Sequence, residues 1–336
     1  MKVLIIGGTG LLGFEAAKQL LSKRHLVTGL ALPPMPEGLI IPANYQLIFQ
    51  NYMEMSDEAL LKIMTGMQAL VFAAGIDERV EGKAPIYDLY DKYNVQPVQR
   101  LLTLACKAKI TSAVILGSYF TYAARKYPKW HLEKYHPYIR ARMAQQEVAL
   151  SFANAGKMDV AVLELPYIFG TQPGRRPVWT ILVAQILAMK RRTYYPRGGT
   201  SMVTVRQAGQ AIVGAILKNG GGHVYPIGYY NMTWKNMLLL FHRYASINRK
   251  IVTIPTWIYK LGVASIVKKK RKKGIEMGLD LVKFAPVMTC NLFIMRDEGA
   301  TFLGVKPDDI NLAIAMSVSA SLDALNGKHM VGMIPE

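Results

Sequence analysis

The order of apolar and polar residues divides the chain into two parts. Up to residue 165, short apolar runs of strand length alternate with stretches in which apolar residues recur every three or four positions, as on one face of a helix. The predicted strands are 3–6, 25–32, 46–49, 69–73, 112–117 and 159–165. The predicted helices are 11–22, 57–64, 87–107 and 138–155. This alternation predicts an α/β fold, a Rossmann-type doubly wound parallel sheet with helices on both faces.

After Pro166 the alternation weakens, and glycine, proline and basic residues cluster in 170–176 and 195–200. One more helix is predicted at 205–217 and one more strand at 223–227. No clean linker separates the parts. We therefore expect a sheet domain over 1–165, to which segments near 203–227 return, and a smaller, mostly helical substrate lobe over 166–336 that is interleaved with it.

Three glycines, Gly7, Gly10 and Gly13, stand three positions apart after the first predicted strand. In a dinucleotide-binding turn, the first permits a tight turn, the second lets backbone approach a pyrophosphate, and the third lets the helix pack on the strand. The N-terminal N–H groups of the helix, which begins with Leu11 and Leu12, attract phosphate. Because a strand precedes the glycines and a helix follows them, we predict dinucleotide binding.

The second predicted strand should end in an acid that binds the adenosine ribose. Ala31 occupies that place, and neither an acid nor an arginine stands there. An acid would favour NAD, and an arginine would favour the 2′-phosphate of NADP. The sequence therefore leaves both NAD and NADP open as the cofactor.

The composition adds a strong basic surplus, with 41 Lys and Arg against 22 Asp and Glu and a formal net charge of +19. Such a surplus indicates affinity for phosphate groups, but it does not distinguish those of nucleotides, nucleic acid or anionic lipid. Its densest part is the unbroken run from Lys268 to Lys273. The two cysteines form no CxxC pair, so we predict neither a metal site nor a disulfide framework.

With these features the chain resembles the extended short-chain dehydrogenase/reductase family, of the NAD-dependent epimerase/dehydratase type. The matching segments are GGTGLLG at 7–13, NYME at 51–54, VFAAG at 71–75, YNVQPVQRLL at 93–102, LELPYIFG at 163–170 and LGVKP at 303–307. The resemblance implies that Asn51 and Tyr52 lie in a turn that contacts adenine and that Asn94 supports the active site. It also implies further cofactor contacts from Ala73, Ala74, Gly75 and Pro166.

The same resemblance implies chemistry by serine, tyrosine and lysine. Ser118, just past a strand, matches the serine, and Tyr138, at the start of a helix, matches the tyrosine that exchanges a proton with the substrate. Arg142 stands where the family has a lysine that lowers the tyrosine pKa and holds the nicotinamide ribose. An arginine keeps the charge and can depress a neighbouring tyrosine's pKa from its usual value of about 10. Its larger fork leaves less room for the ring, so this departure leaves hydride chemistry open.

A literal Tyr-x-x-x-Lys pair, Tyr122 and Lys126, begins four residues after Ser118. We expect this segment to be a loop, whereas the family places its pair on the next helix. We therefore prefer Tyr138 and Arg142, and keep as the alternative that Lys126 reaches inward from the loop.

Substrate contacts are expected from two kinds of residue. Tyr119 and Tyr122 belong to an aromatic group that either lines the pocket or packs beneath it. Arg175 and Arg176 either clamp a substrate diphosphate or are solvated surface charges. Departures from the family motifs downstream, such as Leu165 in place of an arginine, weaken a nucleotide-sugar substrate without excluding one.

Localisation and partners follow from the same residues. The strand-forming run starts at residue 2 and leaves no room for a signal peptide, so we expect a cytoplasmic protein. The basic run from Lys268 to Lys273 follows an apolar helical stretch, which makes peripheral contact with an anionic membrane one interpretation and a solvated loop the other. Nucleic acid is disfavoured because no recognition motif accompanies the run. The resemblance further implies a homodimer formed through the helices at 87–107 and 138–155.

Two hypotheses of function remain. The first is an enzyme, an NAD(P)-dependent oxidoreductase or epimerase/dehydratase that acts on a hydroxyl- or carbonyl-bearing metabolite, with a nucleotide-sugar among the candidates. The second is an NAD(P)-binding sensor of the same fold that turns over weakly or not at all. Ala31 and Arg142 motivate the second hypothesis.

Overall fold

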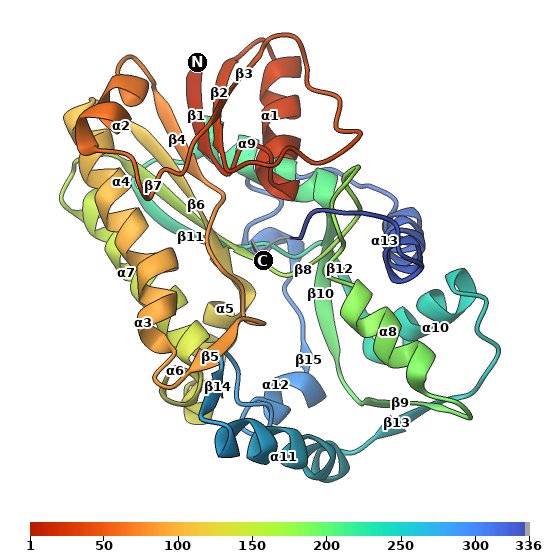
Figure 1. The fold of residues 1–336 in the computed structure, drawn as a ribbon. Coiled ribbons are helices and arrows are strands. Elements are labelled where there is room, and N and C mark those ends of the chain that lie inside the picture. The colour runs from red at the N-terminus through yellow and green to blue at the C-terminus, as the bar shows by residue number, and fades with distance from the viewer. Residues whose placement is uncertain (333–336) are drawn as a thin grey trace.

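A computed structural model of the protein describes residues 1–332, and a seven-stranded sheet forms its centre (Figure 1). All its neighbouring strands are parallel, in the order β11-β7-β6-β4-β1-β2-β3. The strands are β1 (Lys2–Ile6), β2 (Leu26–Ala31), β3 (Tyr45–Phe49), β4 (Ala69–Phe72), β6 (Ser112–Ser118), β7 (Asp159–Leu165) and β11 (Gly222–Pro226). The predicted Rossmann-type sheet is confirmed, and the strand order reverses between β1 and β4, where such sheets bind their ligands.

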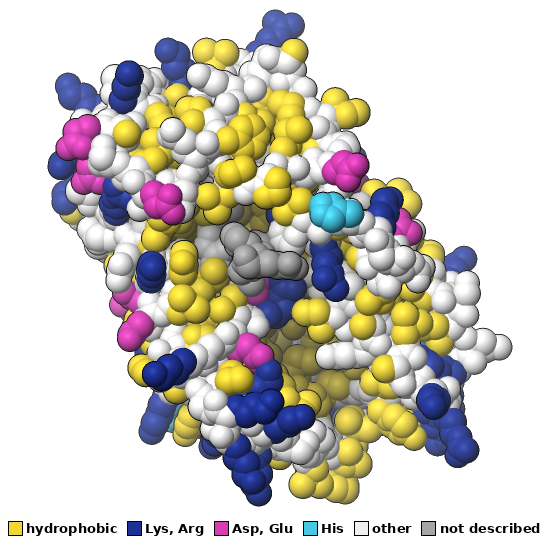
Figure 2. Space-filling model, in the orientation of Figure 1, with side chains coloured by type: hydrophobic (Ala, Val, Ile, Leu, Met, Phe, Trp, Pro, Cys, Tyr) yellow, Lys and Arg dark blue, Asp and Glu magenta, His cyan; other side chains and the backbone are white. Residues whose placement is uncertain are grey.

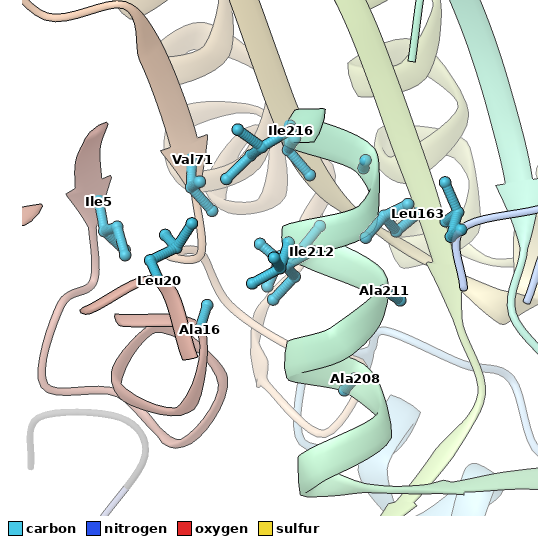
Figure 3. Packing of buried hydrophobic residues seen from close by; sticks show 14 of the residues in the cluster. Ile5, Ala16, Leu20, Val71, Leu163, Ala208, Ala211, Ile212 and Ile216 are labelled. Atoms are coloured by element: carbon cyan, nitrogen blue, oxygen red, sulfur yellow. The ribbon is translucent and has the colours of Figure 1, made fainter. Parts of the chain in front are cut away.

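Helices cover both faces of the sheet, and the strand residues alternate between the two resulting cores. Val3 and Ile5 pack on the face covered by α1 (Leu11–Ser22) and α9 (Val205–Lys218), as Figure 3 shows for Ile5. Leu4 and Ile6 point to the opposite face. That face is covered by α2 (Asp57–Met64), α4 (Gln96–Lys107) and α7 (Pro137–Asn154). Because both faces are buried, the strands read as continuous apolar runs.

The helix predicted over 87–107 is interrupted. It consists of α3 (Tyr87–Tyr90), a π-helical turn at Asp91–Val95, and α4. Pro97 lies in the first turn of α4, and proline has no N–H to donate to an earlier carbonyl. The widened turn brings Asn94 into the protein interior, where it is fully buried.

The second lobe contains more strands than its pattern indicates. Its mixed sheet has the order β12-β10-β15, with β8 paired to β10, and two further two-stranded pairs are β13 with β9 and β14 with β5. These strands are β5 (Glu81–Lys83), β8 (Tyr167–Phe169), β9 (Thr193–Pro196), β10 (Gly199–Thr204), β12 (Tyr230–Thr233), β13 (Ile251–Ile254), β14 (Ile275–Met277) and β15 (Asn291–Leu292). The helices of this part are α8 (Thr180–Ala188), α10 (Trp234–Tyr244), α11 (Thr256–Lys272), α12 (Ala285–Thr289) and α13 (Ile310–Leu325). Such short strands carry too little alternation to be recognised from sequence.

Two short helices, α5 (Tyr119–Lys126) and α6 (Leu132–Tyr135), connect β6 to α7. The expectation that Tyr122 and Lys126 lie in a loop is therefore wrong. Ser118 accepts a hydrogen bond from the N–H of Phe120 (3.2 Å) and so caps a regular helix. The three residues between Ser118 and Tyr122 did not indicate this helix. Within residues 1–332, no helix combines the length and apolar character needed to cross a membrane.

Candidate functional site

The glycine turn lies at the carboxyl end of β1 and opens onto α1. Gly7 has φ +88°, and a Cβ there would lie 2.5 Å from the carbonyl oxygen of Ala73. A Cβ on Gly13 would clash with the carbonyl oxygen of Gly7, so both positions require glycine. Gly10 begins the helix without any side chain bonded to its cap, and Leu11 and Leu12 form the first turn. The N–H groups of this turn are therefore available to an anion.

Tyr45 supports the turn from β3, a contact that the sequence analysis missed. Its hydroxyl donates to the carbonyl oxygen of Gly8 (2.9 Å), and its ring occupies the space that a side chain at Gly29 would fill. Ala31 ends β2 nearby and is 4% exposed. Gly29 on β2 and Tyr45 on β3 are the signals that could have indicated this support. They are 16 positions apart, and no local sequence pattern shows that the two residues meet.

The turn after β3 is closed by its own side chains. Asn51 accepts a hydrogen bond from the N–H of Met53 (3.1 Å) and donates to Glu54 (2.7 Å). Tyr52 is buried edge-on against Phe72, which ends β4. Burial raises the pKa of Tyr52. This turn thus stands beside β2 at the carboxyl edge of the sheet, where the adenine-contacting turn was predicted.

The segment after β4 is held in shape by Asn94. Its side chain accepts from the N–H of Ile76 (2.9 Å) and donates to the carbonyl of the same residue (3.0 Å). Gly75 has φ +115°, and a Cβ there would meet the Asn94 amide oxygen. Gln145 on α7 donates to the Asn94 carbonyl (2.7 Å), which ties α7 to this segment. Asn94 therefore positions the segment that contains Ala73, Ala74 and Gly75.

The structure brings Ser118, Tyr138 and Arg142 together. Ser118 ends β6, and Tyr138 lies in the first turn of α7, where its side chain hydrogen-bonds the Ser118 hydroxyl. Arg142 follows one turn later, with its guanidinium carbon 5.7 Å from the centre of the Tyr138 ring. One arm of the guanidinium donates to the carbonyl of Leu116 in β6 (2.8 Å), which anchors it beneath the tyrosine.

The electrostatics of Tyr138 combine opposing effects. Burial raises the pKa of Tyr138, the charge of Arg142 and the hydrogen bond to Ser118 act to lower it, and the carboxylate of Glu78 raises it further. The net pKa lies above the usual value of a phenol, so the hydroxyl is protonated at neutral pH. In this state Tyr138 can donate a proton, and it needs additional positive charge nearby to accept one.

Glu78 is a second residue that the sequence analysis missed. It is half-buried in the segment that follows Gly75, and burial together with the neighbouring charge of Asp77 raises the pKa of its carboxyl. Arg142 acts on it in the opposite direction. Glu78 and Tyr138 therefore share the influence of one guanidinium. An ion pair between Asp77 and Arg79 flanks Glu78 in this segment.

Tyr119 and Tyr122 use their hydroxyls in contacts with the second lobe. Tyr119 donates to the carbonyl of Leu292 and accepts from Thr200 (2.9 Å). Tyr122 accepts from Lys126 (2.8 Å), and its hydroxyl also lies 3.3 Å from Glu298. These bonds favour the packing interpretation of the aromatic group over a direct substrate contact.

The segment after β8 reaches back onto the glycine turn. Gln172 and Arg175 both donate to the carbonyl oxygen of Thr9, at 3.0 and 3.1 Å. Arg175 also contacts the carbonyl of Gly332 (3.3 Å), whereas Arg176 is exposed. Pro166, which separates β7 from β8, is buried at the start of this return. Burial lowers the pKa of Arg175, because the protein around its guanidinium solvates the positive charge less well than water does.

Two arginines of the site, the buried Arg142 and the half-buried Arg175, retain an unused donor. The Nε atoms of Arg142 and Arg175 have no hydrogen-bond partner among the described residues. One stands beside Tyr138 and the other beside the glycine turn. An acceptor-rich ligand that spans the two positions would satisfy both donors.

Comparison with known proteins gives a consistent result. Residues 3–228 match the family described as the NAD dependent epimerase/dehydratase family. A comparison with the curated proteins found no match. Among solved structures, the crystal structure of gox2253 is similar at a TM-score of 0.75 with 16% sequence identity, over 98% of this chain and 99% of the other.

Two epimerases are also among the similar structures. UDP-glucuronic acid 4-epimerase from Bacillus cereus, in complex with UDP-glucuronic acid and NAD, has a TM-score of 0.68 and 12% identity over 96% of this chain and all of the other. UDP-N-acetylglucosamine 4-epimerase from Methanobrevibacter ruminantium M1, in complex with UDP-N-acetylmuramic acid, has a TM-score of 0.66 and 15% identity over 96% of this chain and 98% of the other. At these identities the likeness shows the fold. The match over residues 3–228 shows more, and it confirms the resemblance seen in the motifs: the chain belongs to the NAD dependent epimerase/dehydratase family.

Proposed function

We propose that the protein is an NAD-dependent epimerase or oxidoreductase that acts on a hydroxyl-bearing carbon of a nucleotide-sugar or a similar metabolite. The observation that carries the proposal is the meeting of Ser118, Tyr138 and Arg142 at the sheet edge that also bears the glycine turn. The epimerase structures with bound UDP-sugars support the substrate class. The cofactor, when bound, supplies hydride exchange at the substrate carbon.

The residues present fit a dinucleotide. The glycine turn leaves a space that a Cβ at Gly7 or Gly13 would fill. The first turn of α1 presents N–H groups to this space, and no side chain caps them. Arg142 would hold the nicotinamide ribose through its Nε, which has no hydrogen-bond partner among the described residues. NAD is preferred over NADP because the family is described by NAD and because no arginine stands at Ala31 to hold a 2′-phosphate.

Arg175 receives a different role from the one that its sequence position suggested. Its guanidinium lies on Thr9 of the glycine turn, so we assign it to the cofactor pyrophosphate and no longer to a substrate diphosphate. A phosphate oxygen would give its buried charge a counter-ion and its Nε an acceptor. Arg176 is exposed and has no comparable position.

The proton chemistry rests on Tyr138. Its hydroxyl exchanges a proton with the substrate hydroxyl, Ser118 bonds the reacting oxygen, and Arg142 stabilises the phenolate when the proton has moved. Because burial raises the pKa of Tyr138, the phenolate form depends on Arg142 and on the positive charge of an oxidised nicotinamide.

The test is turnover of a panel of UDP-sugars, followed by proton NMR for epimer formation, with the wild type and Tyr138→Phe. Loss of a general acid–base group should lower turnover by roughly 10²–10⁴-fold. Tyr122→Phe is the matched control, since it removes the hydroxyl of the alternative Tyr-x-x-x-Lys pair, and should keep activity. Equal turnover in wild type and Tyr138→Phe would refute the assignment.

Two observations favour the second candidate, a dinucleotide-binding sensor. One nitrogen of the Arg142 guanidinium donates a hydrogen bond to the carbonyl of Leu116. The pKa of Tyr138 is also raised. Both features oppose efficient proton abstraction by Tyr138. A sensor would bind NAD tightly by calorimetry and turn over no member of the panel. Turnover that disappears in Tyr138→Phe excludes this candidate.

A further inference from the structure

Helix α11 is exposed around most of its circumference. Of its 17 residues, only Val267 is buried. Trp257 is 63% exposed and Leu261 67%, and Ile258 and Ile266 are exposed as well. An exposed cluster of large apolar side chains on one helix marks a surface that binds something.

The large apolar residues of α11 precede its basic run, with Lys260 as the one cation among them. The last turn carries four consecutive basic residues from Lys269 to Lys272. Trp257, Leu261, Lys268 and Lys272 follow one another at helical spacings of four, seven and four residues, so they share one side of the helix. Figure 2 shows apolar and basic side chains next to each other along the lower edge of the molecule, where Figure 1 places α11.

Most of these cations are not neutralised by the protein itself. Lys270 pairs with Glu81 and Arg271 pairs with Asp280 (2.5 Å). In the part of the chain that the structure describes, Lys268, Lys269, Lys272 and Lys273 form no ion pair. Four adjacent positive charges without carboxylates leave a strong local potential on this edge.

A groove runs beside the basic half of the helix. Its volume is about 540 Å³, and it lies between α11 and the residues that follow β14. Ala264, Val267 and Val282 give it an apolar lining, and Lys268, Lys272 and Lys283 contribute cations. The one carboxylate in the lining, Asp280, is paired with Arg271, which also lines the groove. An apolar lining beside several cations suits an amphiphile with a negatively charged head.

We propose that α11 docks the protein on the surface of an anionic phospholipid bilayer. Trp257 and Leu261 enter the interfacial layer, and the lysines from Lys268 onward contact lipid phosphates, with the groove as the nearest headgroup site. A second copy of the chain fits this surface poorly, because it would bring two unneutralised basic runs together. Nucleic acid would neutralise the lysines but would leave Trp257 and Leu261 in water.

The experiment is co-sedimentation of the full chain with phosphatidylcholine vesicles and with vesicles that also contain phosphatidylglycerol. We expect binding to the anionic vesicles only, weakened by salt as the Debye length falls from about 10 Å at 0.1 M to about 3 Å at 1 M. Leu261→Asp and the double variant Lys268→Glu/Lys272→Glu should each lower the bound fraction at least tenfold. Tryptophan emission should shift to the blue on binding, and Trp257→Phe should abolish that shift.

Matched controls separate this surface from general charge and hydrophobicity. Leu312→Asp changes an exposed leucine on α13, and Lys62→Glu/Lys107→Glu changes the net charge by the same amount on α2 and α4. Both should bind anionic vesicles like the wild type, and circular dichroism should show all variants folded. The proposal is overturned if anionic vesicles fail to sediment the wild type, or if the controls lose binding as strongly as the α11 variants. The proposal is also overturned if Leu261→Asp leaves binding to anionic vesicles unchanged and instead dissociates a dimer or abolishes binding to nucleic acid.

Discussion

Arg142 is the residue on which the proposed chemistry depends. A lysine at this place would be a compact charge with three rotatable donors, whereas the arginine is a planar fork with one arm bound to Leu116. Its charge opposes the effect of burial on Tyr138 and is shared with Glu78. The substitution therefore preserves the sign of the electrostatic effect and alters its geometry.

Removal of this charge should appear in the pH profile. In Arg142→Ala the pKa of Tyr138 should rise further above its usual value, because the phenolate loses the opposite charge that stabilises it. Activity that requires the phenolate should then be at least tenfold lower at neutral pH and should reach its plateau at a higher pH than in wild type. Arg142→Lys should keep the wild-type profile within about half a unit. An unshifted profile in Arg142→Ala would show that the guanidinium does not act on Tyr138.

Arg175 offers a second test at the residue scale. Charge-assisted hydrogen bonds contribute about 1.5–3 kcal/mol, so Arg175→Ala should weaken NAD binding roughly tenfold or more. The neighbouring Arg176→Ala removes an exposed charge of the same kind and should change the affinity less than twofold. Isothermal titration calorimetry measures both without any substrate. Equal losses in the two variants would mean that only the general positive field matters.

Among the elements, α7 matters most because it carries both Tyr138 and Arg142. Its entry is set by His136, which precedes Pro137 at the start of the helix and is fully buried against Phe284. The Nδ1 atom of His136 accepts a hydrogen bond from the N–H of Asp280 (3.1 Å), so the segment after β14 is fastened to the beginning of α7. Burial lowers the pKa of His136 to about 4, with Asp280 acting in the opposite direction.

This buried histidine predicts an acid-sensitive stability. Between pH 6.5 and about 4 the unfolded state binds a proton that native His136 does not, so the free energy of unfolding falls as the pH falls through this window. The loss should reach about 3 kcal/mol near pH 4, at 1.36 kcal/mol per pKa unit. His136→Asn keeps an acceptor and should remove this part of the pH dependence, as measured by urea unfolding at pH 7, 5.5 and 4.5. The exposed His223→Asn is the control, and an unchanged pH dependence in His136→Asn would contradict the assignment.

At the scale of the whole molecule, the two lobes meet on the glycine turn. Gln172 and Arg175 come from the segment after β8, and both bond to Thr9 between β1 and α1. The Gly174 backbone packs against Glu37, which follows β2. A ligand in the turn would thus contact residues far apart in sequence. Homodimerisation through α4 and α7 stays a prediction.

Cofactor binding should consequently stabilise both lobes. At 100 times its Kd, NAD should add about 2.7 kcal/mol to the free energy of unfolding. In hydrogen exchange, new protection should appear in the turn at 7–13 and also in the segment 170–176. Protection confined to the turn would mean that the second lobe takes no part in holding the cofactor, and Arg175→Ala should produce that restricted pattern.

The sequence by itself determined the sheet, the glycine turn and the family. Buried parallel strands are short continuous apolar runs, and the glycine turn needs glycine at positions that lie within seven residues, so both leave local signals. Ser118, Tyr138, Arg142 and Asn94 were predicted as site residues because their motifs carry a recognisable order along the chain.

Only the tertiary structure decided what these residues touch. The charge of Arg142 acts on Glu78, Tyr45 bonds to Gly8, and Arg175 bonds to Thr9 across 166 positions of the chain. It also decided that α11 keeps Trp257 and Leu261 in solvent. The physical reason is that burial and charge depend on neighbours brought together by folding. The local pattern specifies which side of an element is apolar, but not whether anything covers that side.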